Sequence, residues 1–317
     1  MNFDDILAAK RRLLPFLSPT PCPREEVVEN TLDYHSPIYF KLETRQPVGS
    51  FKIRGALNAL LQLSEEEKER GVITRSSGNF SSSLSYAAEQ LNIPLTVVMP
   101  QNASAVKVEI CKQHGARVVL ASSYVECDAV VRRLSDEQGL TRLHPFDHEA
   151  VIAGQGTTAL EILDSTPSIH HFFCPVGGGG LMGGASLAIK TLSPDIITWG
   201  IEPEGANDYT LSRLQGKKVQ LNHIDTIADG LRTPTVGDKT FPLLNTYVDE
   251  VITVTDKEII QAMQELYQLL GVTTEPSGAV SYAGFKKVHD EISGGVAILL
   301  SGKNVEEEFF NTVISSS

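Results

Sequence analysis

Short apolar runs and longer amphipathic stretches alternate along most of the chain. Between the apolar runs, hydrophobic residues recur every three or four positions, as at residues 82–91 and 106–111, which predicts helices with one buried face. The runs have strand length and lie at residues 38–43, 72–74, 95–99, 117–121, 171–176, 196–201, 251–254 and 296–300. Such alternation is typical of parallel sheets covered by helices. We therefore expect an α/β fold with open, mostly parallel sheets.

The order of these elements indicates how the chain divides. With 317 residues, the chain is long enough for two hydrophobic cores. One series of strands and helices falls within residues 71–147, and a second runs from residue 151 to the end. We expect a small α/β domain, residues 71–147, inserted into a larger domain that residues 1–70 and 148–317 form together.

Composition and charge exclude several classes of partner. The net charge of -12 and the pI near 5.2 would repel nucleic acid. No apolar run is long enough to cross a membrane, and two aspartates near the N-terminus argue against a signal peptide. The cysteines lack the spacing of a disulfide framework or a zinc site; they are Cys22, Cys111, Cys127 and Cys174. We expect a cytoplasmic protein that acts on a small molecule.

One lysine stands where covalent chemistry is expected. In the segment Gly-Ser-Phe-Lys-Ile-Arg-Gly-Ala, residues 49–56, Lys52 follows a strand candidate and begins a helical pattern for which Ser50 is the expected N-cap. A positive charge in the first turn opposes the helix dipole, so the amine should lose its proton more readily. Lysines activated in this way form Schiff bases. An ordinary solvated lysine would also suit this position, so the hypothesis needs support from other segments.

Two loops between a strand and a helix are suited to bind anions. Residues 75–83 can turn backbone N–H groups toward a carboxylate, and Ser77 could carry a proton to or from a carbon atom held above it. A serine-capped turn without a ligand is the alternative. Residues 175–184 contain four consecutive glycines, which leave the backbone open to a phosphate.

The glycine-rich loop also allows a rival interpretation. Gly178, Gly180 and Gly183 satisfy the G-x-G-x-x-G fingerprint of dinucleotide sites. Glu202 ends the next strand about 20 residues further on, where such a site needs an acidic residue. A nicotinamide-dependent oxidoreductase is therefore one hypothesis, although it leaves Lys52 and the loop at residues 75–83 unexplained.

Further segments place carboxylates or a hydroxyl in loops. Residues 202–208 gather three carboxylates, which could bind Mg²⁺ or Ca²⁺ or could form a solvated acidic turn. Residues 226–230 and 274–279 each present one carboxylate. Ser301 follows the last strand, at the strand end where open α/β sheets bind ligands, although it could instead cap a helix.

Together, these segments resemble those of the fold-type II pyridoxal-phosphate enzymes, in particular the serine/threonine dehydratase and serine racemase family. The likeness extends from about residue 38 to residue 305. Its motifs, in order, are Gly-Ser-Phe-Lys-Ile-Arg-Gly-Ala, Ser-Ser-Gly-Asn, Ala-Gly-Gln-Gly-Thr at residues 153–157, the glycine loop, Glu-Pro, Ala-Asp-Gly, Glu-Pro-Ser-Gly-Ala and Ser-Gly-Lys-Asn. The resemblance implies a two-domain fold similar to tryptophan synthase β, and a homodimer.

The resemblance assigns roles to individual residues. Lys52 would form the internal aldimine with pyridoxal 5′-phosphate. The other cofactor-binding residues would be Phe51 at the ring face, Asn79 at the 3-hydroxyl, Gly177, Gly178, Gly179 and Gly180 at the phosphate, and Ser301 at the pyridine nitrogen. The substrate-binding residues would be Ser76, Ser77, Asn79, Phe80 through its amide, Gly230 and Glu275. A neutral hydroxyl at the ring nitrogen makes a weaker electron sink than an acid, which suits β-elimination.

The resemblance also implies a reaction. Lys52 would remove the Cα proton of L-serine, L-threonine or a related 3-hydroxy amino acid, and loss of the hydroxyl followed by hydrolysis would give a 2-oxo acid and ammonia. Ser77, on the opposite face, could return the proton and racemise serine. Glu202, Ala206 and Asp208 match the positions that bind Mg²⁺ or Mn²⁺ in metal-dependent members. A β-replacement enzyme and a catalytically inactive relative are the alternatives within this resemblance.

Two positions depart from the usual family pattern. Phe80 stands where the family usually has His after Ser-Gly-Asn, with serines in the next two places. Lys303 replaces the second glycine of Ser-Gly-Gly-Asn. Substrate preference is the property that these departures leave open.

Overall fold

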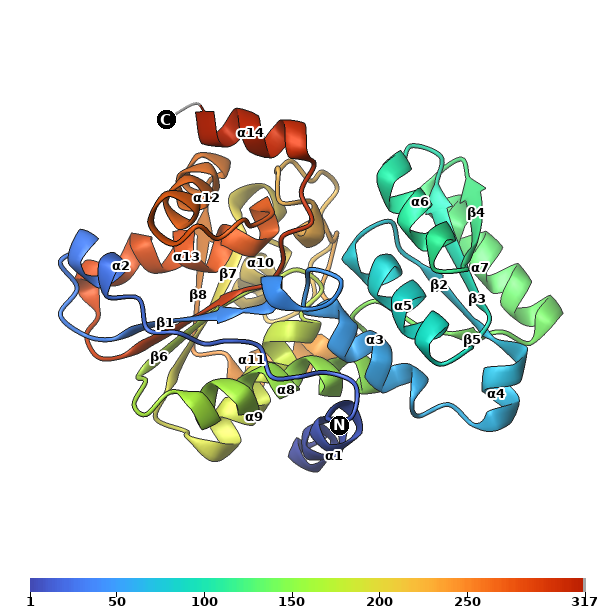
Figure 1. The fold of residues 1–317 in the computed structure, drawn as a ribbon, viewed down its shortest axis with the longest axis horizontal. Coiled ribbons are helices and arrows are strands. Elements are labelled where there is room, and N and C mark those ends of the chain that lie inside the picture. The colour runs from blue at the N-terminus through green and yellow to red at the C-terminus, as the bar shows by residue number, and fades with distance from the viewer. Residues whose placement is uncertain (316–317) are drawn as a thin grey trace.

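Two parallel β-sheets, flanked by helices, organise the chain (Figure 1). The computed structural model describes residues 1–315. The larger sheet has the strand order β1-β9-β6-β7-β8 and the smaller has the order β4-β3-β2-β5. All neighbouring strands in these two sheets are parallel. The expected α/β fold with open parallel sheets is therefore confirmed.

The elements have the following bounds in chain order. The strands are β1 (Ile38–Leu42), β2 (Val72–Arg75), β3 (Leu95–Pro100), β4 (Arg117–Ala121), β5 (Thr141–Arg142), β6 (His171–Pro175), β7 (Ile197–Pro203), β8 (Glu250–Val254) and β9 (Val296–Leu300). The α-helices are α1 (Phe3–Leu13), α2 (Glu26–Thr31), α3 (Lys52–Leu60), α4 (Glu65–Arg70), α5 (Asn79–Gln90), α6 (Ala105–Gln113), α7 (Tyr124–Gln138), α8 (Glu149–Ser165), α9 (Gly180–Leu192), α10 (Asp208–Gln215), α11 (Thr240–Tyr247), α12 (Asp256–Leu270), α13 (Pro276–Val288) and α14 (Glu307–Ser315). The 3₁₀-helices are η1 (Glu43–Arg45), η2 (Glu204–Ala206), η3 (Asp229–Leu231) and η4 (His289–Glu291).

Side chains of the larger sheet alternate between two hydrophobic cores, as the pleat of a strand requires. On one face, Phe40, Phe173 and Ile298 share a core with residues of α12 and α13. On the other face, Tyr39 and Phe172 share a core with residues of α8 and α9. Because both faces are covered, the strands are continuous apolar runs in the sequence. This is why their positions could be predicted closely.

The smaller sheet is packed in the same way. Val72 and Val97 belong to a core that α3 and α5 complete, whereas Ile73 and Val98 belong to a core on the α7 side. Its four strands all lie within residues 71–147, the stretch expected to form the inserted domain. Since α3 precedes that stretch yet packs against α5, the sheets alone do not fix the domain boundaries, and these stay a prediction.

Two local predictions were wrong. Helix α3 begins at Lys52 with Phe51 as its N-cap residue and without a side-chain cap, so Ser50 is not the cap. Ser50 instead forms an isolated antiparallel bridge with Gly302, which holds the start of α3 against the segment after β9. The helix expected from residue 82 begins three residues earlier, at Asn79.

All four cysteines are free thiols. Among residues 1–315, no helix combines the length and the apolar character that crossing a membrane requires.

Candidate active site

Lys52 lies in partly desolvated surroundings at the start of α3. Its Nζ donates a hydrogen bond to the Pro145 carbonyl at 3.2 Å and lies 4.9 Å from the centroid of the Phe51 ring. Burial lowers the pKa of the amine to about 8, against the opposing charge of Glu275. The sequence predicted this direction from the helix dipole, but burial is the larger cause. A part of the amine is therefore uncharged near neutral pH.

The backbone around Lys52 joins the predicted Ser301 segment. The Phe51 N–H donates to the Ser301 carbonyl at 3.1 Å, and Ser301 is buried with its Oγ donating to the Ser277 carbonyl at 3.3 Å. Upstream, Gly49 has a φ of 71°, and a Cβ there would lie 2.4 Å from Oδ1 of Asn304. Only glycine fits that position, because L-residues rarely adopt positive φ and the space is filled.

Three separate motifs meet at Asn79. Its Nδ2 donates to Oε1 of Glu275 at 2.6 Å, and its Oδ1 accepts from Nδ2 of Asn304 at 2.8 Å. Burial, followed by the charge of Asp229, raises the pKa of Glu275 to about 8. This carboxyl therefore holds its proton more tightly than an exposed glutamate does. Asn304 was not predicted as a site residue, although it closes the Ser-Gly-Lys-Asn motif.

The loop between β2 and α5 presents the first turn of a helix. The Gly78 N–H donates to Ser76 Oγ at 3.4 Å, and Ser81 Oγ donates to the Gly78 carbonyl at 2.7 Å. The Phe80 side chain is only 1% exposed and belongs to the core shared by α3 and α5. This leaves only its amide to serve an anion at this helix start, which is the role that the resemblance implies. Ser77 lies in the same loop.

The glycine loop leads from β6 into α9 and is buried throughout. Gly179 has a φ of 86° and is the N-cap residue of α9. A Cβ on Gly178 would lie 2.3 Å from the Phe146 ring, and one on Gly177 would lie 3.2 Å from Leu231 Cα. No residue of the described chain accepts a hydrogen bond from the N–H groups of residues 177–180. These donors are available to an anion such as a phosphate.

Gly230 lies near the glycine loop. Its N–H donates to Ser277 Oγ at 2.9 Å, and its carbonyl lies 3.5 Å from the position of a Cβ on Gly177. The structure thus places the Ala-Asp-Gly and Glu-Pro-Ser-Gly-Ala motifs next to the glycine loop, which is the candidate phosphate-binding segment.

The segment after β5 was missed by the sequence analysis. The Pro145 carbonyl accepts from Lys52, the Phe146 ring fills the space beside Gly178, and Asp147 accepts from the backbone N–H groups of residues 238 and 239. His144 Nδ1 accepts from the Asp147 N–H at 2.9 Å, and burial lowers the pKa of His144 to about 4, so its ring is neutral. The sequence carried no clear signal for this segment, because the strand before it, β5, is only two residues long and forms no apolar run.

The predicted metal residues lie around the start of α10. Both Glu202 oxygens are occupied, since one accepts from the Tyr209 N–H at 2.9 Å and the other from the Thr210 N–H at 2.7 Å and the Thr210 hydroxyl at 2.6 Å. Neither Asp208 oxygen has a hydrogen-bond partner, although the side chain is buried. Ala206 is also buried, in η2.

Burial raises the pKa of both carboxyl groups at this turn, to about 7 for Glu202 and, together with the charge of Glu202, to about 8 for Asp208. A buried carboxylate without partners is costly, so this donor set suits a bound cation. Over the described residues, no cluster of three or more His, Cys, Asp or Glu side chains is poised to hold a metal. A metal here would need the Ala206 carbonyl or water as a further ligand.

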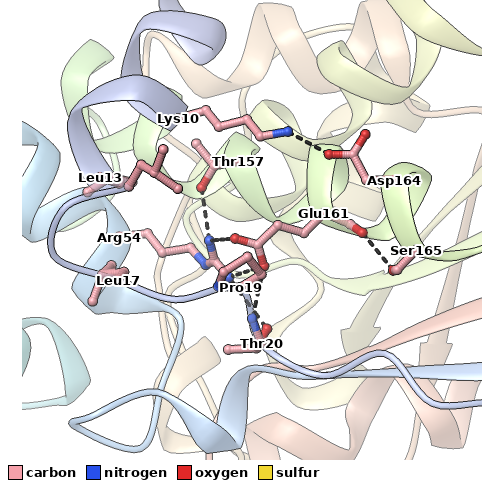
Figure 2. Close-up of a pocket in the computed structure, with 11 residues that line it drawn as sticks. Lys10, Leu13, Leu17, Pro19, Thr20, Arg54, Thr157, Glu161, Asp164 and Ser165 are labelled. Carbon is pink, nitrogen blue, oxygen red and sulfur yellow. Dashed lines mark hydrogen bonds and ion pairs between the residues drawn. The ribbon is translucent and has the colours of Figure 1, made fainter.

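Arg54 and Glu161, shown in Figure 2, belong to a buried ionic cluster that also includes Glu43 and Lys41. Arg54 binds Glu43 through Nε and Nη2, both at 2.8 Å, and binds Glu161 at 2.6 and 2.7 Å. Lys41 donates to the same Glu161 at 2.6 Å, and Thr20 Oγ1 donates to Glu43 at 2.6 Å. The adjoining cavity of about 170 Å³ is lined by none of the predicted site residues. The cluster therefore fixes the helix that carries Lys52 without touching the site.

Comparison with known proteins agrees with this geometry. The family described as pyridoxal-phosphate dependent enzymes matches residues 13–302. The chain is 39% identical over 316 residues to L-threo-3-hydroxyaspartate ammonia-lyase of Saccharomyces cerevisiae, covering 99% of this chain and 96% of that protein. It is 37% identical to serine racemase of Oryza sativa subsp. indica, covering 96% and 91%. The structure of maize serine racemase superposes with a TM-score of 0.93 at 36% identity, covering 99% and 97%.

Proposed function

Because the chain belongs to the pyridoxal-phosphate dependent enzymes, we propose that it converts a 3-hydroxy amino acid, such as L-serine or L-threonine, into a 2-oxo acid and ammonia. The observation that carries this proposal is the position of Lys52, whose amine has a lowered pKa near Glu275 and whose neighbour Phe51 is bonded to the Ser301 carbonyl. The nicotinamide alternative is not supported, since the Glu202 oxygens it needs for a ribose cap α10 instead.

The residues present fit pyridoxal 5′-phosphate. The buried N–H donors of Gly177 to Gly180 would hold its phosphate, and Phe51, Asn79 and Ser301 would surround its ring. When bound to Lys52, the cofactor supplies an electron sink that stabilises negative charge at the substrate Cα. One observation supports this fit: the N–H groups of residues 177–180 have no acceptor within the described chain, and a phosphate would provide one.

The chain's own groups can then perform the proton transfers. Lys52 accepts the Cα proton, because a pKa of about 8 leaves a fraction of the free amine uncharged near neutral pH. The Ser76 hydroxyl and the amides of Asn79 and Phe80 orient the substrate carboxylate at the start of α5. The β-hydroxyl leaves with a proton as water, and water then returns oxygen to Cα when ammonia is released, so the net change is loss of ammonia.

Racemisation is the second outcome that we propose for this site. Ser77 would donate a proton to Cα on the face opposite Lys52, as in the family resemblance. The ratio of D-serine to pyruvate formed from L-serine should fall in Ser77→Ala. An unchanged ratio would count against Ser77 as the second proton carrier.

We further propose Mg²⁺ or Mn²⁺ at Glu202, the Ala206 carbonyl and Asp208, because the buried Asp208 oxygens lack partners. We also propose that residues 71–147 form a domain separate from the remainder of the chain. We propose that the protein is a homodimer and that it is located in the cytoplasm. Sedimentation of the purified chain tests the dimer, and a single species with the monomer mass of 34.5 kDa would refute it.

The decisive experiment is an absorption spectrum of the purified protein with pyridoxal phosphate, followed by borohydride reduction and mass mapping. We expect a visible band and a reduced adduct on Lys52, with Lys107→Ala as a control that retains both. L-serine and L-threonine are then offered to the unreduced enzyme, and pyruvate or 2-oxobutyrate is measured. A protein that stays colourless, or an adduct elsewhere, would refute the proposal.

A further inference from the structure

The peptide unit between Gly178 and Gly179 sets the direction of one candidate phosphate donor. In a trans peptide, the Gly178 C=O and the Gly179 N–H point in opposite directions, and no peptide bond among residues 1–315 is cis. Neither glycine has a Cβ, so rotation of this unit meets little steric resistance of its own. Whatever holds the Gly178 carbonyl therefore also directs the Gly179 N–H.

Thr240, the first residue of α11, holds that carbonyl. Its Oγ1 donates to the Gly178 carbonyl at 2.7 Å and accepts from the Gly237 N–H at 2.9 Å. The Gly237 N–H also approaches the Gly178 carbonyl, but only to 3.4 Å. Thr240 is fully buried, so water does not compete for its hydroxyl. The hydroxyl is therefore the main partner of this peptide unit.

Packing confines the same peptide unit. Gly179 has a φ of 86°, and a Cβ there would lie 2.9 Å from Thr240 Oγ1 and 2.8 Å from Leu244 Cδ1. A Cβ on Gly178 would lie 2.3 Å from the Phe146 ring. Because the Gly178 carbonyl is turned toward Thr240, the Gly179 N–H points away from α11, where no residue of the described chain accepts it.

Asp147 holds the turn that carries Thr240. Its two carboxylate oxygens accept from the backbone N–H groups of residues 238 and 239, at 3.0 and 2.7 Å. A Cβ on Gly237 would lie 2.3 Å from Asp147 Oδ1, so the carboxylate fills the space beside this glycine. Asp147 follows Pro145 by two residues, and Pro145 accepts the hydrogen bond of Lys52. One short segment thus contacts the amine directly and reaches the glycine loop through α11.

We propose that Thr240 is a positioning residue for the phosphate of the cofactor. It holds the Gly178 carbonyl so that the Gly179 N–H faces the phosphate, and Asp147 keeps Thr240 in place. This inference rests on the proposed function, because it concerns the cofactor of the same reaction. The backbone N–H groups would contact the phosphate themselves, so loss of either side chain should weaken recognition of the phosphate and leave recognition of the pyridine ring unchanged.

Spectral titration of the full-length chain, freed of cofactor, tests this role with two compounds, pyridoxal phosphate and pyridoxal, which differ only in the phosphate. Thr240→Val keeps the shape of the side chain and removes the hydroxyl. It should raise the Kd for pyridoxal phosphate about tenfold, as expected for one lost hydrogen bond, without changing the Kd for pyridoxal. Thr240→Ser should restore the wild-type ratio of the two values. Thr246→Val is the matched control, since Thr246 is exposed on α11 and donates to the Pro242 carbonyl, and it should keep that ratio.

A second variant tests the contribution of Asp147 and serves if Thr240→Val does not fold. Asp147→Asn keeps one acceptor but turns an N–H group toward the other backbone donor, so the ratio should change in the same direction, by about threefold or more. Glu149→Gln is its control. Glu149 is exposed and pairs with the Lys239 side chain at 3.1 Å, so the variant removes a nearby charge without changing the backbone contacts and should keep the wild-type ratio.

Inorganic phosphate separates this inference from the proposed function. Phosphate should raise the melting temperature of the cofactor-free wild type more than that of Thr240→Val. Equal losses of affinity for pyridoxal phosphate and pyridoxal in Thr240→Val, or a wild-type ratio in both Thr240→Val and Asp147→Asn, would overturn the positioning role. If neither pyridoxal compound gives a visible band in the wild type while phosphate still stabilises it through Thr240, the proposed function fails and the phosphate site stands.

Discussion

Replacing Glu43 by Gln tests whether the buried ionic cluster supports the fold at Lys52. The Glu43 carboxylate is fully buried and accepts from Arg54 twice, from Thr20 and from Gln46. A glutamine has almost the same shape, but it removes the charge and turns an N–H group toward one of these donors. The substitution thus breaks the electrostatics with little change in packed volume.

The magnitude follows from the pKa of Glu43. Burial alone would raise it, but the Arg54 guanidinium lowers it from 4.5 to about 2. That difference corresponds to about 3 kcal/mol of stability. Breaking a buried pair costs about 3 to 5 kcal/mol, and Glu161 still neutralises Arg54 in the variant, so we expect a loss near the lower value.

The direction of the pKa shift of Glu43 determines how its contribution to stability changes with pH. The pKa of Glu43 in the folded state lies below its ordinary value. At pH values between these two pKa values, the unfolded chain therefore binds more protons than the folded chain. The contribution of Glu43 is fully present above about pH 4.5 and is lost as the pH falls toward about 2. The stability gap between wild type and Glu43→Gln should therefore be widest near neutral pH and should narrow below about pH 4.5.

Urea unfolding of both proteins at several pH values measures this gap. The control is Glu66→Gln, which removes an exposed pair with Arg70 and should cost no more than about 0.5 kcal/mol. If Glu43→Gln is as stable as the wild type near pH 7, or if the gap does not change with pH, the cluster does not contribute through the ionised Glu43. The reasoning would then be refuted.

Further outcomes are expected at the site itself. Lys52→Ala should abolish the reduced cofactor adduct and lower kcat by about 10³-fold or more, as mass mapping and 2-oxo acid assays would show. In the wild type, kcat should rise with pH through about 8 and then level off, because only the uncharged Lys52 accepts a proton; a profile that falls over this range would contradict that role. Gly178→Ala should weaken binding of pyridoxal phosphate at least tenfold in a spectral titration, since its Cβ would meet Phe146 at 2.3 Å and displace either the loop or the ring. Chelation should lower the melting temperature of the wild type but not of Asp208→Asn, and equal shifts in both proteins would exclude a metal at Asp208.

The features that were predicted best are those that follow from a local sequence pattern. Buried parallel strands are continuous apolar runs, so β4 and β9 were placed to the residue. The glycine loop and Lys52 were found because glycine and lysine have distinct chemistry at a strand-to-helix turn. The N-cap of α3 was wrongly expected at Ser50, because Ser50 forms a tertiary bridge with Gly302 and Phe51 is the N-cap residue.

Features that depend on distant contacts could not be predicted. The pairing of Arg54 with Glu161 joins residues 107 positions apart, and neither side chain has a local pattern that names its partner. The approach of Pro145 to Lys52 has the same origin, because it follows from the order of strands in the smaller sheet. Such contacts become visible only when the topology is known.

The structure also shows how a change at residue 80, directly after the Ser-Ser-Gly-Asn motif, can reach the site. The Phe80 ring is enclosed in a hydrophobic core, so a change at this position alters packing and reaches the site only through its amide. Substitutions that keep an apolar residue at Phe80 should therefore change stability and leave substrate preference largely unchanged.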